Sequence, residues 1–143
     1  MTYYIDTNIF LYTANPRDPH YSACKNILKL AGQEKISSVT SVLTFEEIIF
    51  YSQKSDSIEN GINICNFILK NPIGIIPLTQ TIIFKFLKLA KNYPKIRSAD
   101  LIHTSTCLLN NIDSVISVDR DFDKISEIKR IDPSDLTFFP INS

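Results

Sequence analysis

Four acidic side chains stand at positions where the surrounding sequence is apolar or helical. Asp6 ends the apolar start of YYIDTNIF, and Asp119 follows the apolar run in SVISVDRDF. Glu47 interrupts the apolar stretch VLTFEEIIF, and Asp100 comes early in a helical pattern in IRSADLIH. Carboxylates that meet in one crevice repel each other, and their pKa values rise unless a cation neutralises them. If the fold brings these acids together, they predict a metal site.

The ligands in this set would all be oxygens. Neither His nor Cys stands at the spacing of a metal site, so the expected ion is a hard one, Mg²⁺ or Mn²⁺. Such a site can activate water for in-line attack on a phosphodiester and stabilise the leaving oxygen. The predicted chemistry is therefore metal-assisted hydrolysis of a phosphodiester bond.

Segments with the pattern of strands alternate with segments that have the pattern of helices. Short β-branched, aromatic and other apolar runs predict strands at 2–5, 35–39, 74–77, 114–118 and 129–131. Apolar residues at helical spacing predict helices at 20–31, 42–51, about 58–69, 79–92 and 98–110, the last with Ser98 as its N-cap. This alternation predicts an α/β fold with a mainly parallel sheet. Because the functional crevice of such a sheet lies at the carboxyl ends of its strands, Asp6 and Asp119 are expected to face it together.

Three of these acids could also have a purely structural role. Asp6 could cap the short helical turn that follows it. Glu47 could close a capping box with Thr44, and Asp100 could merely favour the dipole of its helix from the first turn. A single topology that brings four acids to one place weakens these alternatives taken together.

The aspartates of DRDFD, residues 119 to 123, alternate as in a calcium loop. That motif fails, because Lys124 stands where the loop needs Gly and Arg130 stands where it needs the closing Glu. A solvated turn is the favoured structural interpretation for Asp121 and Asp123.

Histidine and cysteine chemistry is not indicated. His20 and His103 have no serine or cysteine partner at motif spacing, so we expect ordinary surface or helix residues. Cys24, Cys65 and Cys107 are too far apart for a zinc site and odd in number for a disulfide framework, which predicts reduced thiols.

Composition limits the remaining function classes. With 143 residues, 44% of them apolar, the chain is expected to form one domain over residues 1–143. Lys plus Arg and Asp plus Glu both number 15, so partners must be argued from local charge. The three glycines form no phosphate-cradling motif. No apolar run reaches the roughly 20 residues that span a bilayer and no signal peptide is evident, so we expect a cytoplasmic protein with no membrane segment.

The motifs taken together resemble the PIN domain from end to end. DTN follows the first strand, then come LTFEEIIF, SADLIHTSTCLLNNI and SVDRDF, followed by the tail ISEIKRIDP. The resemblance implies a three-layer α/β/α fold with a central parallel sheet of about five strands flanked by helices. It also implies a metal-dependent ribonuclease site, usually with Mg²⁺ or Mn²⁺, whose acids fall on Asp6, Glu47, Asp100 and Asp119. Three further positions match residues that often support this site, namely Asn8, Ser117 and Asp121.

Small single-domain PIN proteins include the VapC-like toxins of toxin-antitoxin pairs. For this chain the resemblance implies endonucleolytic cleavage of RNA through a metal-bound water, inhibition by a small antitoxin protein and a homodimer. Two alternatives remain open. One is a PIN-like scaffold that binds RNA or protein without turnover, and the other is an RNA-processing nuclease without an antitoxin. An intact set of four acids argues against the scaffold, which has no need of clustered like charges.

The choice of helix acid rests on two opposed patterns. The family pattern has a Thr three residues before the acid and an aliphatic residue after it, which selects Glu47. A helical wheel counted from Val42 instead places Glu46 deeper in the apolar arc. We expect Glu47 to be the site acid, because such an acid should lie where a core face meets the crevice, and we keep Glu46 as its rival.

The predicted helix at 79–92 has two faces. Its expected core face is formed by Ile82, Ile83, Phe86, Leu87 and Ala90. The opposite face carries lysines, of which Lys88 and Lys91 are expected to track an RNA backbone, although a merely solvated lysine face is the alternative. Arg97, three residues before Asp100, is the best candidate for a phosphate contact near the acids.

Overall fold

The computed structural model describes residues 1–135 of the chain. The strands are β1 (Thr2–Ile5), β2 (Ser37–Ser41), β3 (Ile73–Ile76), β4 (Ser114–Ile116) and β5 (Lys129–Ile131). The helices are α1 (Thr7–Leu11), α2 (Tyr21–Gly32), α3 (Val42–Lys54), α4 (Ile58–Lys70), α5 (Gln80–Asn92) and α6 (Ser98–Leu109). Two 3-10 turns complete the order, η1 (Tyr12–Ala14) and η2 (Arg120–Lys124).

The five strands form one sheet in the order β3-β2-β1-β4-β5, and each pair of neighbours is parallel. This confirms the predicted α/β fold with a central parallel sheet of five strands. Three strands differ from their predicted bounds by one or two residues. β2 lies two residues later than predicted, β3 lies one residue earlier, and β4 ends at Ile116 and not at residue 118.

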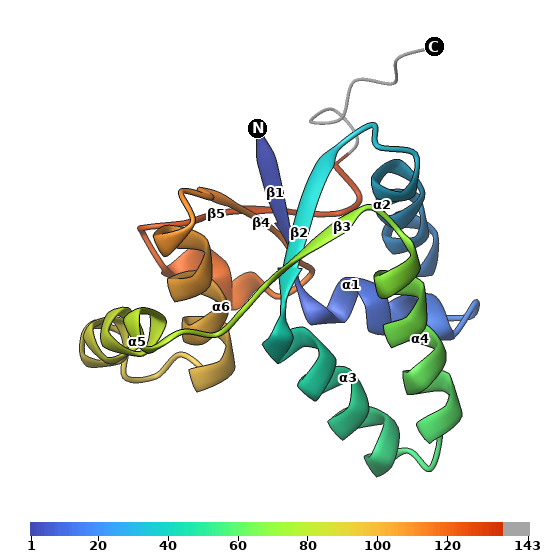
Figure 1. Ribbon diagram of the computed structural model, residues 1–143, viewed down its shortest axis with the longest axis horizontal. Helices are drawn as coiled ribbons and strands as arrows, with labels where there is room; N and C mark the ends of the chain where they lie inside the picture. Colours follow the sequence, from blue (N-terminus) through green and yellow to red (C-terminus); the bar gives the residue numbers. More distant parts are fainter. Residues whose placement is uncertain (136–143) are drawn as a thin grey trace.

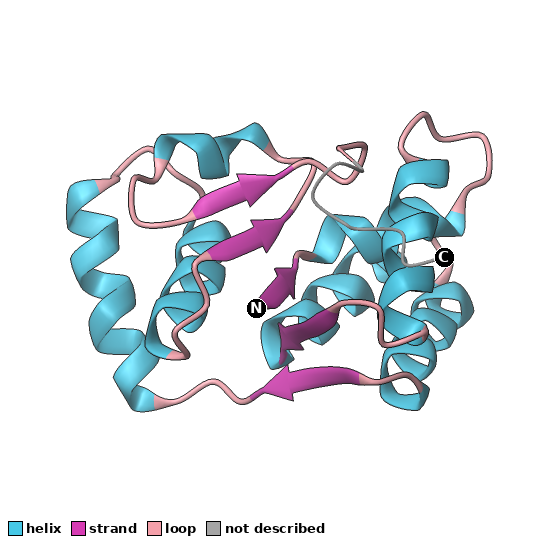
Figure 2. Ribbon diagram, turned by 90° about the horizontal axis from the view of Figure 1, so that it is seen from above, coloured by secondary structure: helices cyan, strands magenta, loops and turns pink. Residues whose placement is uncertain are grey.

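Helices cover both faces of the sheet, and alternating side chains explain how. On β1, Tyr4 and Ile5 point to opposite faces and belong to two separate hydrophobic clusters, and Val115 and Ile116 on β4 repeat this alternation. The cluster around Ile5 includes residues of α1, α2, α3 and α4, whereas the cluster around Tyr4 includes residues of α5 and α6. The two groups of helices lie on opposite sides of the sheet (Figures 1 and 2), as expected for three layers.

The chain reverses its direction of winding at β1. From β1 it proceeds outward through β2 to β3, then crosses to the other side of β1 to add β4 and β5. Neighbouring strands β1 and β4 therefore send their following loops to opposite faces, which leaves a crevice at their carboxyl ends. Residues that directly follow these two strands stand at this crevice.

Two expectations about helices are wrong. The N-cap of α6 is Arg97, not Ser98, and no side chain forms a cap hydrogen bond there. On α5, Ile82 is buried, but Ile83 and Leu87 are 55% and 57% exposed, so the expected core face is only partly in the core. The reason is that α5 packs chiefly on α6, and a single neighbour covers a narrower stripe than the sequence offers.

The cysteines agree with expectation where the structure bears on them. Cys24 and Cys107 are buried, Cys65 is half-buried, and all three are free thiols. Burial raises the pKa of the Cys24 thiol to about 12. Within residues 1–135, no helix has the length and apolar character needed to cross a membrane.

Candidate active site

Asp6 lies at the point where β1 stops and α1 begins. Its backbone N–H still pairs with the carbonyl of Ile116, 3.1 Å away, while its side chain has turned to other partners. Oδ1 accepts a hydrogen bond from the backbone N–H of Thr7 at 2.8 Å, and Oδ2 accepts one from Ser117 Oγ at 2.6 Å. Asp6 is therefore the N-cap of α1 and is buried at the crevice at the same time.

Burial raises the pKa of Asp6, although nearby His103 and the hydrogen bond from Ser117 oppose the rise. A buried carboxylate with a raised pKa is costly to keep ionised. A helix cap at the surface would not carry this cost, so capping alone does not explain why Asp6 is buried.

Glu47 projects from α3 toward the same crevice and is buried. Its Oε1 accepts hydrogen bonds from Thr7 Oγ1 at 2.8 Å and from His103 Nε2 at 2.6 Å. Its Oε2 lies 3.4 Å from Arg97 Nη2. Burial alone would raise the pKa of Glu47, but the hydrogen bond and charge of His103, the hydrogen bond from Thr7 and the charge of Arg97 together outweigh it, so the pKa is lowered.

The capping-box alternative for Glu47 is wrong. The N-cap of α3 is Ser41, so Thr44 lies inside the helix. The Thr44 hydroxyl instead accepts a hydrogen bond from Thr40 Oγ1 at 2.7 Å.

Glu46, the rival acid, is exposed to solvent on α3. The helical wheel that favoured it was anchored on Val42, which is 47% exposed and does not mark the core face. With Val42 outside, the buried arc passes through Glu47 and Ile48. The structure thus brings Glu47, and not Glu46, to Asp6.

Asp100 lies in the first turn of α6 and is fully buried. Its Oδ1 accepts a hydrogen bond from Arg97 Nη2 at 2.9 Å. Its Oδ2 is buried and has no hydrogen-bond partner among residues 1–135. Burial raises the pKa of Asp100 to about 6, against the opposing effect of Arg97. This unpartnered oxygen is the least satisfied atom of the site.

Asp119 and Asp121 are placed by the turn that follows β4. Ser117 Oγ accepts hydrogen bonds from the Asp119 backbone N–H and from Asn8 Nδ2, each at 3.0 Å. The Asp119 carboxylate in turn accepts the Asp121 N–H at 2.9 Å as the cap of η2. Of the residues predicted to support the site, Ser117 and Asp121 therefore contact its acids directly, and Asn8 contacts them through Ser117.

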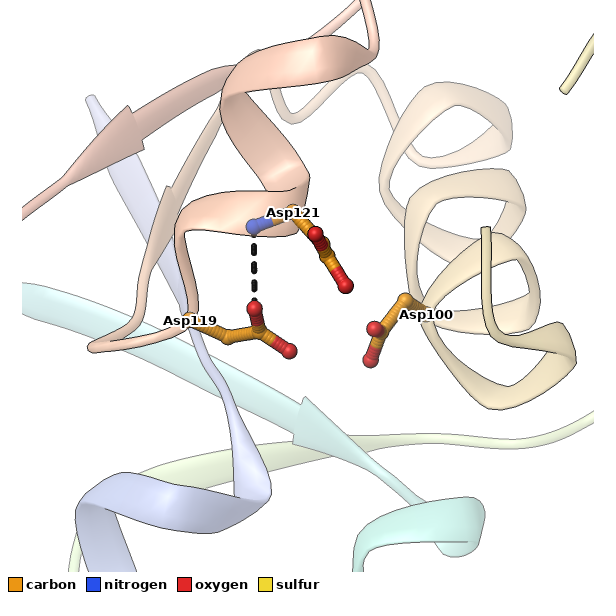
Figure 3. Close-up of side chains that lie close together, drawn as sticks. All are labelled: Asp100, Asp119 and Asp121. Atoms are coloured by element: carbon orange, nitrogen blue, oxygen red, sulfur yellow. Dashed lines mark hydrogen bonds between the residues drawn. The ribbon is translucent and has the colours of Figure 1, made fainter. Parts of the chain in front are cut away.

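The solvated-turn interpretation holds for Asp123 but not for Asp121. Asp123 is exposed and pairs with Arg130 at 3.0 Å. Asp121 is half-buried, and although Lys124 reaches one of its oxygens at 2.7 Å, its carboxylate lies beside those of other acids. One oxygen each of Asp100, Asp119 and Asp121 lie within 4.8 Å of one another, and Figure 3 shows the three side chains converging.

The acids thus fall into two groups. We call Asp100, Asp119 and Asp121 the aspartate trio, and Asp6 and Glu47 the histidine-linked pair, because His103 Nε2 lies 3.6 Å from Asp6 Oδ1 and 2.6 Å from Glu47 Oε1. An oxygen-only trio with an unpartnered buried oxygen fits a hard divalent cation.

His103 was expected to be an ordinary surface or helix residue, and that expectation is wrong. The side chain is fully buried behind Glu47. Its Nδ1 lies 2.5 Å from Tyr4 Oη, and the Tyr4 hydroxyl donates to Ser41 Oγ at 2.7 Å. Burial alone would lower the pKa of His103, but its hydrogen bond to Glu47 and the charge of Asp6 raise it. A signal existed, because His103 stands three residues after Asp100 on one helix face.

A cleft of about 510 Å³ opens in front of Asp6, Glu47 and Asp119, while Asp100 and Asp121 are not part of its lining. Its lining comprises Asp6, Thr7, Asn8, Leu11, Tyr12, Glu47, Tyr51, Arg97, Val118, Asp119 and Arg120. Arg97 therefore stands at the cleft as predicted for a phosphate contact, held by Asp100 and by Tyr51 Oη at 2.9 Å. Lys88 and Lys91 are exposed on α5 and do not line the cleft.

A parallel α/β sheet with clustered acids at its switch point agrees with the family that sequence comparison finds. The model of the PIN domain matches residues 3–128. The chain belongs to the PIN domain family. No curated protein sequence matches it significantly.

Solved structures of similar fold come from toxin-antitoxin systems. VapBC2 from Rickettsia felis, bound to a promoter DNA fragment, is 20% identical with a TM-score of 0.73, and the match covers 92% of this chain and 98% of that one. VapC20 from Mycobacterium tuberculosis, a toxin that cleaves the sarcin-ricin loop, is 12% identical with a TM-score of 0.75 and coverages of 89% and 97%. VapBC-1 from nontypeable Haemophilus influenzae is 22% identical, with a TM-score of 0.69 and coverages of 93% and 98%. These likenesses agree on the fold.

Proposed function

We propose that this protein is a metal-dependent endoribonuclease that hydrolyses RNA phosphodiester bonds. The observation that carries the proposal is the aspartate trio, in which Asp100 Oδ2 is buried without a hydrogen-bond partner among the described residues. A buried ionised oxygen is costly unless a cation or a donor satisfies it. Membership of the PIN domain family supports the same reading of the site.

The catalytic acids in this proposal are Asp6, Glu47, Asp100 and Asp119, which would hold a Mg²⁺ or Mn²⁺ ion with help from Asp121. When bound, such an ion supplies Lewis-acid assistance to the attacking water and the leaving oxygen. Ser117 contributes by fixing Asp6 and the Asp119 backbone through one hydroxyl, and Asn8 donates to that hydroxyl.

Arg97 is the proposed contact for an RNA phosphate. Its side chain is 46% exposed at the cleft, and Asp100 and Tyr51 hold its two terminal nitrogens in a fixed position. A planar guanidinium suits phosphate oxygens. Lys88 and Lys91 would extend the path for the RNA backbone along α5.

The lysine path has its own test. Changing Lys88 and Lys91 together to Ala should make the salt dependence of RNA binding less steep, by about 1.4 in the slope of log K against log salt, since each single-strand phosphate contact contributes about 0.7. A matched control replaces Lys29 and Lys35, which are exposed on α2 and in the loop that follows it. Equal slopes in all three proteins would mean that Lys88 and Lys91 are merely solvated and do not contact the RNA backbone.

The proposal extends to partners. The similar structures are toxin-antitoxin complexes, which supports a toxin that pairs with a small antitoxin protein. Inhibition by that antitoxin and a cytoplasmic homodimer belong to the same proposal through the family resemblance alone. The alternative is a PIN scaffold that binds RNA or protein without turnover, and an RNA-processing nuclease without antitoxin is the third possibility. The unpartnered Asp100 oxygen disfavours the scaffold, which has no use for it.

Calorimetric titration of Mn²⁺ tests the proposal without a guess about the RNA. Binding should be measurable in the wild type and lost, or weakened at least about tenfold, in Asp6→Asn and Asp119→Asn. Asp123→Asn is the matched control, because this exposed acid lies in the same turn outside the trio. Wild-type binding followed by cleavage of a mixed RNA pool supports the nuclease. A wild type that binds Mn²⁺ and RNA but cleaves none contradicts it and favours the scaffold.

A further inference from the structure

The two oxygens of the Glu47 carboxylate have different surroundings. Oε1 accepts two hydrogen bonds, from Thr7 Oγ1 at 2.8 Å and from His103 Nε2 at 2.6 Å. A carboxylate oxygen offers about two lone pairs, so these two donors saturate Oε1. Among residues 1–135, Oε2 pairs with one cation, the guanidinium of Arg97, at 3.4 Å. The oxygen left for chemistry at the cleft is Oε2.

The His103 imidazole, which holds Oε1 through Nε2, is itself held at its other nitrogen, Nδ1. Tyr4 Oη lies 2.5 Å from His103 Nδ1 and hydrogen-bonds to Ser41 Oγ at 2.7 Å. The two rings also meet edge to face, with centroids 5.4 Å apart. Tyr4, Ser41 and His103 are fully buried, so water does not compete for these hydrogen bonds. The chain from Ser41 through Tyr4 to His103 is therefore a rigid support.

Arg97 shows what the support prevents. Its Nη2 donates to Asp100 at 2.9 Å while standing 3.4 Å from Glu47 Oε2. A guanidinium and a free carboxylate tend to form a two-point pair. Without the hydrogen bond from His103, Glu47 would turn both oxygens toward Arg97. Arg97 would then leave Asp100, and Glu47 Oε2 would no longer be available to the cleft.

We propose that His103 is a positioning residue, which holds Glu47 by Oε1 so that Oε2 stays aimed into the cleft and Arg97 stays on Asp100. The residue acts through Glu47 and touches no substrate itself. This inference rests on the proposed ribonuclease function, because the aim of Oε2 matters only if the cleft performs chemistry.

Two substitutions separate positioning from simple packing. His103→Leu fills the space but donates nothing, and it should lower kcat for RNA cleavage by about 10- to 100-fold with KM within about twofold, as expected for loss of a hydrogen bond to a charged group. His103→Gln carries an amide N–H that can replace Nε2–H, and it should recover most of the loss. Equal losses in both variants would overturn the proposal. His20→Leu, at an exposed position, is the control for histidine loss.

A double variant tests the route through Glu47. In a Glu47→Ala background, measured by single turnover with protein in excess, adding His103→Leu should leave the residual rate unchanged. A further loss of tenfold or more would mean that His103 acts by another route, and the proposal would be wrong.

Nitrogen-15 labelled histidine gives a readout that needs neither RNA nor metal. The Nε2–H resonance of His103 should move markedly in Glu47→Gln and stay in place in Glu46→Gln, the neighbouring exposed acid. An unmoved resonance in Glu47→Gln overturns the hydrogen bond and the proposal with it. If the wild type shows the hydrogen bond between His103 and Glu47 but cleaves no RNA, the proposed ribonuclease function is wrong. The positioning role, which rests on that function, is then wrong as well.

Discussion

The two groups of acids at the cleft solve the problem of buried negative charge in different ways. In the histidine-linked pair, Asp6 and Glu47 receive hydrogen bonds from the protein on three of their four oxygens. In the aspartate trio, Asp100 keeps a buried oxygen with no partner among residues 1–135, and burial raises its pKa to about 6. One group is complete within the fold, and the other is not.

The difference separates two roles among the clustered acids, that of a fixed carboxylate and that of a metal ligand. Glu47, with a lowered pKa and a saturated oxygen, is prepared as a fixed carboxylate. Asp100, with a raised pKa, gains most from a cation that replaces its missing partner. Substitutions in the trio should therefore act first on metal binding, and substitution of Glu47 should act first on turnover.

The largest effect is expected from Asp100→Asn. Removing the charge of the least satisfied ligand should weaken Mn²⁺ binding at least about 100-fold and abolish measurable RNA cleavage. Calorimetry and a cleavage assay check both, with Asp123→Asn as control. If Asp100→Asn binds Mn²⁺ as the wild type does, the trio is not the metal site and the comparison fails.

Glu47→Gln should reduce cleavage about 100-fold but weaken Mn²⁺ binding no more than about tenfold, since this acid is held by Thr7 and His103 before any ion arrives. Glu46→Gln should behave as wild type in both assays, because that side chain is exposed. An inactive Glu46 variant beside an active Glu47 variant would reverse the assignment.

Metal affinity should depend on pH through the trio. Because the pKa of Asp100 is raised to about 6, protonation competes with the cation, and the Kd for Mn²⁺ should rise about tenfold for each pH unit below 6. Titrations at pH 5, 6 and 7 measure this slope. A constant affinity across the range would show that Asp100 is not protonated there, and the contrast with Glu47 would lose its basis.

The smallest effect concerns stability without metal. Asp6 and Asp100 both have raised pKa values in the folded protein, so the fold binds more protons than the unfolded chain at mildly acidic pH, and their contribution to stability falls as pH rises through the folded pKa. Asp6→Asn should therefore melt, in EDTA at pH 7, at the same temperature as wild type or up to about 4 °C higher. A marked fall in melting temperature would mean that the ionised Asp6 carboxylate stabilises the metal-free fold, contrary to this prediction, because Asn retains the oxygen that caps α1.

Much of the site follows from local rules that the sequence states openly. An acid directly after a buried strand, as at Asp6 and Asp119, predicts its own position once strands and helices alternate, because parallel strands end at one edge. These two acids needed only the order of elements. Ser117 was named through the family resemblance alone, and in the structure its hydroxyl donates a hydrogen bond to Asp6.

The rest depended on packing that sequence does not give. Val42 is apolar and yet 47% exposed, so a wheel that begins there turns α3 the wrong way. On α5, Ile83 and Leu87 share the apolar pattern of buried residues but stay outside, since only α6 covers that helix closely. His103 was missed because its partners, Tyr4 and Glu47, come from two other elements of the fold.

The hydrogen bond between Ser117 and Asp6 joins residues that are 111 positions apart. A ribosome adds about 5 to 20 residues each second, so on the order of ten seconds separates the synthesis of the first acid from that of the last. Throughout that interval β1 is without the β4 strand that completes its edge and without the turn that carries Asp119 and Asp121. The cleft is therefore incomplete until the chain has been synthesised at least as far as Asp121 and β4 has paired with β1.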